Sequence, residues 1–184
     1  MTKLLFSNIL RGVPFVFLKN TTFRAQNIHL LLPDYVLYYL ALHMKLSSRT
    51  SESQLVEIFA YENSVSANTD SGYAASSNSS VVYQFHNLFS QERLFVFACS
   101  LNPLSSPSPK SVDELYASSW WLEREAGELN GICFEHKKDL RNLMLQYGDA
   151  SAPFKKSYPS IGFKEVVFDS VTDTVVQVPV SIQV

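Results

Sequence analysis

The sequence predicts an α+β fold: a small, mostly antiparallel sheet with packed helices, followed by an extended, loop-rich C-terminal region and tail. Three observations support this prediction. Runs rich in β-branched and aromatic residues lie at 54–61, 81–89 and 93–101, as pleated strands favour. Apolar residues recur at helical spacing after Asp34. A basic, proline-rich turn at 153–159 then precedes an alternating tail.

The composition bounds the class of protein. With 184 residues, the chain is long enough for one domain with a substantial core. Its apolar content of 46% and aromatic content of 13% exclude a mainly disordered chain. The formal net charge of -2 argues against a general binder of nucleic acid or anionic membranes, since such footprints are strongly basic. Cys99 and Cys133 are too few for a secreted disulfide framework, so a reducing compartment is expected.

No segment is predicted to span a membrane. The most apolar window, 28–44, is broken by Pro33 and Asp34, and its uncharged part is shorter than the about 20 apolar residues that a bilayer needs. Residues 1–18 resemble a signal peptide in having a lysine before an apolar run. Arg11 interrupts that run and no small-residue cleavage site follows it, so an ordinary buried N-terminal element is expected.

A strand and a helix are predicted next along the chain. The short apolar run at 28–32 is consistent with a buried strand. From Asp34 the helical spacing is carried by four apolar residues: Leu37, Leu40, Ala41 and Met44. Because tyrosines and a further leucine make the other faces apolar as well, this helix is expected to be nearly enclosed.

The three strand-like runs follow, separated by polar segments. Residues 90–92 suit a tight antiparallel hairpin between the runs at 81–89 and 93–101. Residues 62–80 are dominated by Ser, Asn and Ala with almost nothing to bury, so they are expected to form a mobile surface insertion. Residues 101–111 are a second loop, in which prolines prevent the strand from continuing.

Two further helices are predicted. Ser111 and Glu114 have the spacing of a capping box, so a helix is expected to begin at Ser111 and run toward the tryptophans. Its inner face would comprise Val112, Leu115, Tyr116 and Ser119. A second helical stripe comprises Leu140, Leu143, Met144 and Tyr147. Gly148 would end that helix in the left-handed conformation.

The C-terminal residues have a strand pattern. Residues 163–169 are predicted to form a strand, and residues 176–184 alternate strictly between apolar and other residues. Pro179 excludes the tail from a central position in a sheet. The tail is therefore expected to be an edge strand or to lie along a partner.

The candidate reactive groups lack the partners that chemistry needs. Glu123 and Glu125 could form a general acid and base pair, but their position beside Arg124 favours buried or interfacial ion pairs. Cys133, His136 and Asp139 recur every three residues, which resembles metal-ligand spacing. No second Cys or His pair completes a tetrahedral site, which favours a buried Cys133 and a hydrogen-bonded His136 near a helix start.

The remaining polar groups are equally unspecific. His29, His43 and His86 lie in apolar elements, where a satisfied core imidazole is the usual state. The scattered glycines form no phosphate loop. Lys155 and Lys156 could contact an anionic partner or form a solvated basic turn. The sequence therefore indicates a surface that holds partners.

Residues 121–165 carry an ordered set of motifs: W-x-E-R-E, an acid, G-I-x-F, then H, L-R, Y-G, a proline-rich basic turn and G-F-x-E. This order resembles the signature of the 30-kDa, or C-type, subunit family of respiratory complex I, called NADH dehydrogenase subunit 9 when mitochondrially encoded. The similarity extends over roughly the last hundred residues, and only by element order over the N-terminal third. The residues that match the signature are Trp121, Glu123, Arg124, Glu125, Glu128, Gly131, Ile132, His136, Leu140, Arg141, Tyr147, Gly148, Pro153, Lys155, Lys156, Pro159, Gly162 and Glu165.

The chain also departs from the family pattern. Lys137 replaces the expected proline and Asn142 the second arginine, with further departures at Gln146, Asp149, Ala152 and Ser157. The contacts of the 149–157 turn are therefore the least predictable part of the region. Together with the Ser/Asn-rich insertion, these departures would suit a fast-evolving chain encoded in the organelle.

The resemblance implies a structural or assembly subunit in the peripheral arm of proton-pumping NADH:ubiquinone oxidoreductase, on the matrix side of the mitochondrial inner membrane. It implies packing against the 49-kDa-type subunit near the quinone module, with no cofactor, metal or catalytic residue of its own. The signature residues would lie at subunit interfaces of this hetero-oligomer. The chain itself would bind no nucleic acid and would associate with the membrane only through the complex.

Two alternatives remain open from the sequence. One is the equivalent subunit of a chloroplast or cyanobacterial NDH complex, or of a membrane-bound hydrogenase. The other is a freestanding hydrolase that uses Glu123 and Glu125. The expected organisation is an α+β core at 1–110 with the insertion at 62–80, a signature region at 111–170 and an extended tail at 171–184.

Overall fold

The first half of the chain forms one mixed sheet with strand order β1-β2-β5-β4-β3. The computed structural model describes residues 20–24, 27–48, 50–64, 77–88, 91–100 and 107–181. Only the β2–β5 pairing is parallel, and the other three pairings are antiparallel. The strands are β1 (Asn20–Arg24), β2 (Asn27–Pro33), β3 (Ser53–Ser64), β4 (Ser77–Asn87) and β5 (Arg93–Cys99). The predicted α+β class, the mostly antiparallel sheet and the antiparallel pairing of β4 with β5 are confirmed.

The predicted insertion at 62–80 is shorter than expected. β3 continues to Ser64 and β4 begins at Ser77, so both ends of the polar segment belong to a paired ribbon. Ser79 and Ser80 are buried. Ladder hydrogen bonds use only the backbone, which is why polar side chains do not end the strands here. Residues 65–76, like the predicted N-terminal element at 1–18, lie outside the described residues.

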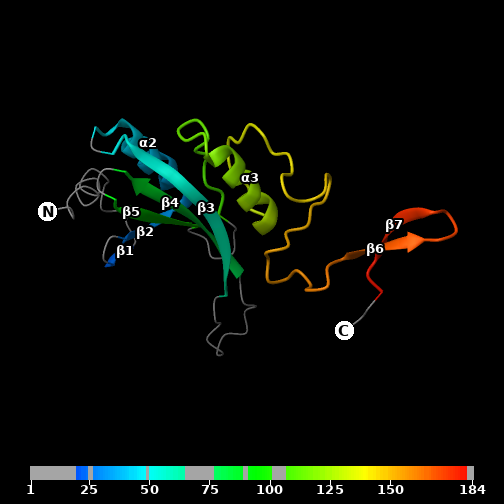
Figure 1. Cartoon of the computed structure of the whole chain (residues 1–184). Helices are drawn as coiled ribbons and strands as arrows, with labels where there is room; N and C mark the ends of the chain where they lie inside the picture. Colours follow the sequence, from blue (N-terminus) through cyan, green and yellow to red (C-terminus); the bar gives the residue numbers. More distant parts are fainter. Residues whose placement is uncertain are drawn as a thin grey trace, which may run out of the picture.

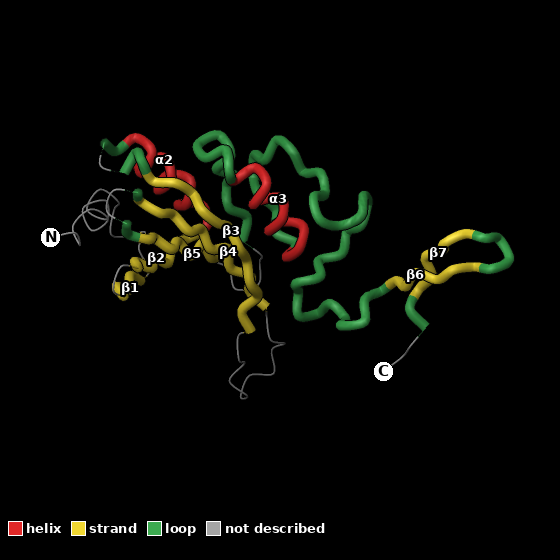
Figure 2. The backbone as a smooth tube through the Cα atoms, in the orientation of Figure 1, coloured by secondary structure: helices red, strands yellow, loops and turns green. Residues whose placement is uncertain are grey.

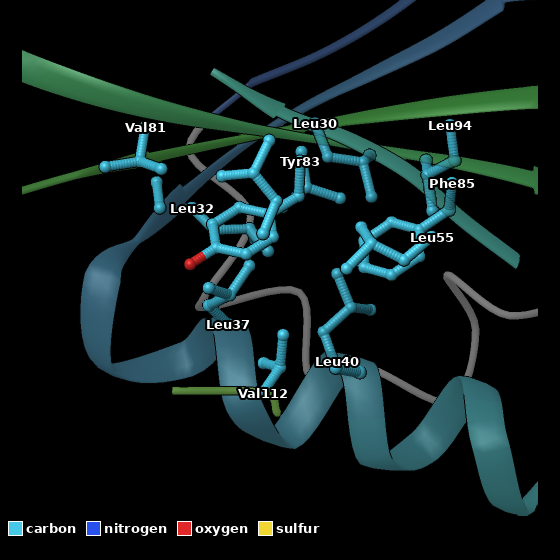
Figure 3. Close-up of a cluster of buried hydrophobic side chains, with 14 of the residues drawn as sticks. Leu30, Leu32, Leu37, Leu40, Leu55, Val81, Tyr83, Phe85, Leu94 and Val112 are labelled. Atoms are coloured by element: carbon cyan, nitrogen blue, oxygen red, sulfur yellow. The ribbon is translucent and has the colours of Figure 1, made fainter. Parts of the chain in front are cut away.

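Helix α2 (Leu37–Leu46), entered through the 3-10 turn η2 (Asp34–Val36), covers one face of the sheet (Figures 1 and 2). Its buried side chains are those predicted: Leu37, Leu40, Ala41 and Met44. They share one core cluster with sheet residues such as Leu30, Tyr83 and Phe85. Figure 3 shows Leu37 and Leu40 of the helix pointing toward these sheet residues. The helix is not nearly enclosed, because Tyr39 on its other side is 69% exposed, and Tyr35 in the turn that precedes it is 49% exposed. One apolar stripe is enough to cover the sheet.

Helix α3 (Ser119–Asn130) packs beside β3, where the Ser118 hydroxyl donates to the Leu55 carbonyl over 3.0 Å. The prediction that this helix begins at Ser111 is wrong. Residues 113–115 form a turn, and the Ser111 hydroxyl bonds the Glu123 carboxylate instead of capping a helix. The predicted inner face is nevertheless buried at Val112, Tyr116 and Ser119. Burial was therefore predictable where helicity was not.

The predicted helix at 140–147 does not form. Leu140, Met144 and Tyr147 are 75%, 64% and 76% exposed, in a loop that side chains of α3 hold. Gly148 has the expected left-handed conformation, with φ 80°, but it ends no helix. The glycine that ends a helix is Gly131, with φ 66°, directly after α3.

The C-terminal residues form a separate two-stranded antiparallel sheet of β6 (Lys164–Asp169) and β7 (Thr174–Pro179). This confirms the predicted strand at 163–169 and an edge strand in the tail as far as Pro179. Figure 1 shows the hairpin standing apart from the five-stranded sheet, at the end of the loop-rich region. Neither described helix is long and apolar enough to cross a membrane.

Candidate interaction site around helix α3

The centre of the signature region is a buried carboxylate. Glu123 lies on the inner face of α3 and is 1% exposed. Its Oε2 accepts a hydrogen bond from the Ser111 hydroxyl at 2.6 Å, and its Oε1 accepts one from the Val112 backbone N–H at 2.8 Å. Burial raises the pKa of the Glu123 carboxyl, and these donors, together with Lys137, oppose the rise. Glu123 therefore joins α3 to the segment that precedes it.

The counter-charge comes from a residue that departs from the family pattern. The Lys137 Nζ lies 3.0 Å from the Glu123 Oε2 and 3.6 Å from the Asp113 Oδ2, with a side chain only 1% exposed. The expected ion pair of Glu123 is confirmed. Because a buried charge needs a partner, Lys137 completes this site.

Arg124 binds the loop that follows. Its guanidinium donates to the carbonyls of Arg141 at 2.8 Å and Asn142 at 3.1 Å, and it lies 3.6 Å from the Asp139 carboxylate. It also lies over the Trp121 ring, 5.6 Å from the centroid. Hydrogen bonds from Arg141 hold the pKa of Asp139 well below its usual range. The expected ion pair of Arg124 is thus confirmed, and its guanidinium fixes the loop backbone.

Glu128, one turn further along α3, binds three consecutive backbone amides. Its carboxylate accepts hydrogen bonds from Leu143 at 2.7 Å, from Met144 at 3.0 Å and from Leu145. Partial burial alone would raise the pKa of Glu128, but these donors and nearby Arg124 lower it below its ordinary value. The carboxylate satisfies amides that a helix would have bonded internally, which explains why the predicted helix is replaced by a loop.

Other departures from the family pattern stabilise the same loop. The Asn142 side chain donates to the carbonyls of Gln146 at 3.0 Å and Asp149 at 3.1 Å. The Gln177 side chain of β7 donates to the Gln146 side chain over 3.0 Å, which links the loop to the hairpin. The Asp149 carboxylate accepts a bond from the Ser151 backbone at 3.0 Å. Sequence reasoning treated these positions only as departures, and no local signal marked them as contacts.

The proline-rich turn packs on the end of α3. The Phe154 backbone N–H donates to the Leu129 carbonyl over 2.9 Å. A Cβ atom at Gly131 would lie 2.9 Å from the Lys155 side chain and 3.2 Å from the Ala152 Cβ. The left-handed φ of 66° explains why a glycine occupies the position, because the tip of the Lys155 side chain could move away from a Cβ atom. The Lys156 backbone donates to the Glu62 carboxylate over 2.6 Å, which ties the turn to β3.

The remaining signature positions divide into inner and outer residues. Ile132 is buried, whereas Trp121, Leu140, Tyr147 and His136 are exposed. Glu125 forms no ion pair with any described residue, so its expected pair is not found there. The other positions shape or flank the turn and the hairpin: Pro153, Pro159, Gly162 with φ 82°, and Glu165, whose carboxylate lies 3.4 Å from the Ser181 hydroxyl.

The expectations for the metal-like trio are wrong in two respects. Cys133 is exposed and not a small core residue, and His136 lies in an exposed turn with φ 59°, away from any helix start. Across the described ranges, no three His, Cys, Asp or Glu side chains converge as metal ligands. His29, His43 and His86 are half-buried and not core residues, and His29 stacks on Phe95 with ring centroids 5.1 Å apart.

The site also has a cavity and an apolar outer surface. A cavity of about 250 Å³ lies between α3 and residues 132–142, lined by residues that include Arg124, Phe134 and Leu140. Large apolar side chains also face solvent along the loop, the turn and the hairpin: Leu140, Met144, Tyr147, Phe154, Ile161, Phe163, Val166 and Phe168. So many exposed apolar side chains in one region are typical of a surface that contacts another protein.

The geometry is that of an α+β domain whose helix α3 shapes a long loop with an apolar outer surface. A sequence profile of the family described as "Respiratory-chain NADH dehydrogenase, 30 Kd subunit" matches residues 36–164. The chain therefore belongs to this family, as the order of motifs predicted.

Curated relatives carry corresponding names. The chain is 34% identical over 126 residues to NADH-ubiquinone oxidoreductase subunit 9 of Paramecium primaurelia, which covers 67% of this chain and 58% of that protein. It is 44% identical over 77 residues to the C-type subunit of the NADH-quinone oxidoreductase of Coxiella burnetii, covering 42% and 34%. The chain thus spans between about a third and three-fifths of the length of these relatives.

A solved structure shares the fold. A chain from the membrane-bound sulfane sulfur reductase, an archaeal respiratory membrane complex, aligns with a TM-score of 0.55 at 15% sequence identity. The alignment covers 78% of this chain and 75% of that chain. At this identity, the likeness concerns the fold alone.

Proposed function

We propose that this chain is a structural and assembly subunit of the peripheral arm of proton-pumping NADH:ubiquinone oxidoreductase. In this proposal it packs against the 49-kDa-type subunit near the quinone module, on the matrix side of the mitochondrial inner membrane. It acts by fixing the geometry of its neighbours and contributes no catalytic residue or cofactor of its own. Family membership and the names of the relatives support this assignment.

One observation carries the proposal: the charged signature residues are used to shape a loop. Glu123, Arg124 and Glu128 each bind backbone or counter-charges of segments outside α3. A general acid or base must reach its substrate, and Glu123 is 1% exposed with its carboxylate occupied by three donors. This arrangement favours a docking surface over the hydrolase alternative.

The signature positions then have two roles in the proposal. The buried ones hold the loop in one shape, and the exposed ones, such as Trp121, Leu140 and Tyr147, contact the partner. A surface that is already ordered loses less conformational entropy on binding, so a held loop binds more tightly than a free one. We extend this division to the whole chain: residues 1–110 act as the core, 111–170 as the docking region and 171–184 as the tail.

The experiment compares two exposed leucines. Leu140→Ser removes an apolar side chain, 75% exposed, from the proposed surface, and Leu46→Ser removes one, 77% exposed, at the end of α2. The tagged full-length variants are expressed in cells that lack the native chain, and the fraction recovered with NADH-oxidising membrane complexes is measured. Leu140→Ser is expected to lower this fraction and Leu46→Ser to leave it unchanged. Equal recovery of both variants would contradict a docking role for the loop.

A further inference from the structure

The β6–β7 hairpin is a ribbon with two edges, and the two edges differ. The strands pair only with each other within the described part of the chain. The Val180 backbone N–H donates to the Phe163 carbonyl over 3.2 Å, and these two residues are direct cross-strand partners in the extended register. In an antiparallel pair, hydrogen-bonded and non-hydrogen-bonded pairs alternate. The orientation of every backbone group in the ribbon follows from this one bond.

The outer edge of β7 lacks one of its backbone N–H donors. By this alternation, the pairs Lys164–Pro179, Val166–Gln177 and Phe168–Val175 are non-hydrogen-bonded, so their N–H and C=O groups point away from the ribbon. Pro179 has no N–H to offer at the outer edge of β7. A proline at such a position is a common device that blocks strand addition.

The outward-facing backbone groups of β6 are complete. Lys164, Val166 and Phe168 present three N–H donors and three carbonyl acceptors along this edge. The side chains of Val166 and Phe168 are 65% and 60% exposed, and the facing Val175 is 67% exposed. This edge therefore has both the main-chain groups and the apolar side chains that a further strand uses.

The charges on the two faces of β6 restrict what could pair there. Side chains alternate along a strand, so one face carries Lys164, Val166 and Phe168, and the other carries Glu165, Val167 and Asp169. The second face has two carboxylates on either side of a valine that is 46% exposed. A strand with basic, apolar and basic residues opposite these three positions would complement it in charge and shape.

We propose that the outer edge of β6 accepts an extended segment of a neighbouring subunit as a third strand. The segment has an acidic residue and two apolar residues on one face, and basic residues flanking an apolar residue on the other. The sequence predicted that the tail is an edge strand or lies along a partner, but β7 is already paired with β6 and its outer edge is interrupted by Pro179. The identity of the neighbour as a subunit of the respiratory complex rests on the proposed function.

Two proline variants test the edge directly. Val166→Pro removes one outward N–H from β6, and Gln177→Pro removes the outward N–H of its cross-strand partner on β7. Neither substitution removes a backbone hydrogen bond between β6 and β7. Gln177→Pro also loses the side-chain bond to Gln146, so Gln177→Ala, which loses that bond alone, serves as its reference. Val166→Thr, which keeps both the N–H and a branched side chain, controls for the lost valine side chain. Circular dichroism and thermal unfolding of each free chain check that the hairpin and fold persist.

The first readout is incorporation of each full-length variant into the membrane complex. Val166→Pro is expected to lower recovery by about tenfold, the effect of losing about 1.4 kcal/mol of binding free energy. Gln177→Pro is expected to stay within about twofold of Gln177→Ala, and Val166→Thr within about twofold of the wild type. The second readout is hydrogen exchange of the unsubstituted chain. Assembly is expected to slow exchange at Val166 and Phe168 and to leave Val175 and Gln177 unchanged.

A third readout does not need the complex. A synthetic peptide is added to the free chain, with Glu, Ile and Tyr placed opposite Lys164, Val166 and Phe168 and with Lys, Val and Lys opposite the second face. Slower hydrogen exchange at Val166 with this peptide, but not with a peptide of scrambled order, would support the strand site on β6. This result would hold even if the chain did not enter a respiratory complex, an outcome that would refute the proposed function alone.

Two results overturn the inference. One is normal assembly of Val166→Pro, together with fast exchange at Val166 of the unsubstituted chain in the complex. This result would leave the proposed function intact. The other is protection of Val166 in the free chain that rises with chain concentration, which would make a second copy of this chain the occupant.

Discussion

Replacing Lys137 with methionine removes the lysine that pairs with Glu123. Removing one partner of a fully buried ion pair lowers the free energy of unfolding by about 3–5 kcal/mol. Two uncharged donors, from Ser111 and Val112, remain on the carboxylate at 2.6 and 2.8 Å, so we expect the lower end of this range, about 3 kcal/mol. For a chain of this size, about 2–4 °C of Tm accompanies each kcal/mol, which gives a fall of about 6–12 °C.

The neighbouring residue provides a matched control. Lys138 pairs with Glu114 at 3.2 Å, with side chains 75% and 60% exposed. Exposed pairs of this kind contribute at most about 1 kcal/mol, so Lys138→Met should change the free energy of unfolding little. Urea unfolding of the two variants and the wild type, followed by tryptophan fluorescence, gives the comparison. The double variant Glu123→Gln with Lys137→Met should recover part of the loss.

The pH dependence gives a second check on the same variant. Burial already raises the pKa of Glu123, and removing Lys137 takes away a group that opposes this rise. The folded variant then binds a proton that the unfolded chain has released, so its stability relative to the wild type falls as the pH rises above about 4.3. The deficit should be smaller at about pH 5 than at about pH 7.5. A Lys137→Met chain that is as stable as Lys138→Met at both pH values would refute the buried-pair account.

Three further predictions concern the loop around α3. Glu128→Gln should speed hydrogen exchange at the three loop amides that the carboxylate binds by about tenfold or more, whereas Glu125→Gln on the same helix should not. Gly127→Ala should destabilise the chain by about 1–3 kcal/mol in thermal unfolding despite its better helix propensity, because the new Cβ would lie 2.9 Å from the Ile132 carbonyl. Hydrogen bonds from Arg141 lower the pKa of Asp139, so this carboxylate stabilises the loop above about pH 4. Its contribution is lost as the pH falls through the lowered pKa. Asp139→Asn should therefore remove that part of the acid dependence of hydrogen exchange in the loop.

The strands were predictable because their signal is local. Runs such as 93–101 alternate or cluster β-branched and aromatic residues, and the ladder needs nothing else from the sequence. Hydrophobic spacing likewise identified the buried stripe of α2. The parallel pairing of β2 with β5 was not predicted, because it joins segments far apart in the chain and has no local signature.

The helices predicted from Ser111 and at 140–147 do not form there, for a different reason. Ser111 has the spacing of a capping box, but its hydroxyl donates to Glu123, 12 residues away, and its oxygen accepts from the Asp113 backbone N–H at 3.4 Å in a turn. Residues 140–147 have a helical stripe, but the Glu128 carboxylate binds the backbone amides that a helix would have used. In both cases a tertiary contact competes with the local preference, and local rules cannot see it. The same holds for Lys137, which the sequence marked only as a departure and the structure places as the buried counter-charge.

The account makes this chain a part of a larger respiratory assembly. Native separation of membrane complexes, followed by mass spectrometric identification of the band that contains the chain, tests this claim most directly. The account predicts that the chain migrates with the NADH-oxidising complex, together with its 49-kDa-type subunit. Migration of the chain as a free monomer, with the complex fully assembled without it, would contradict the account.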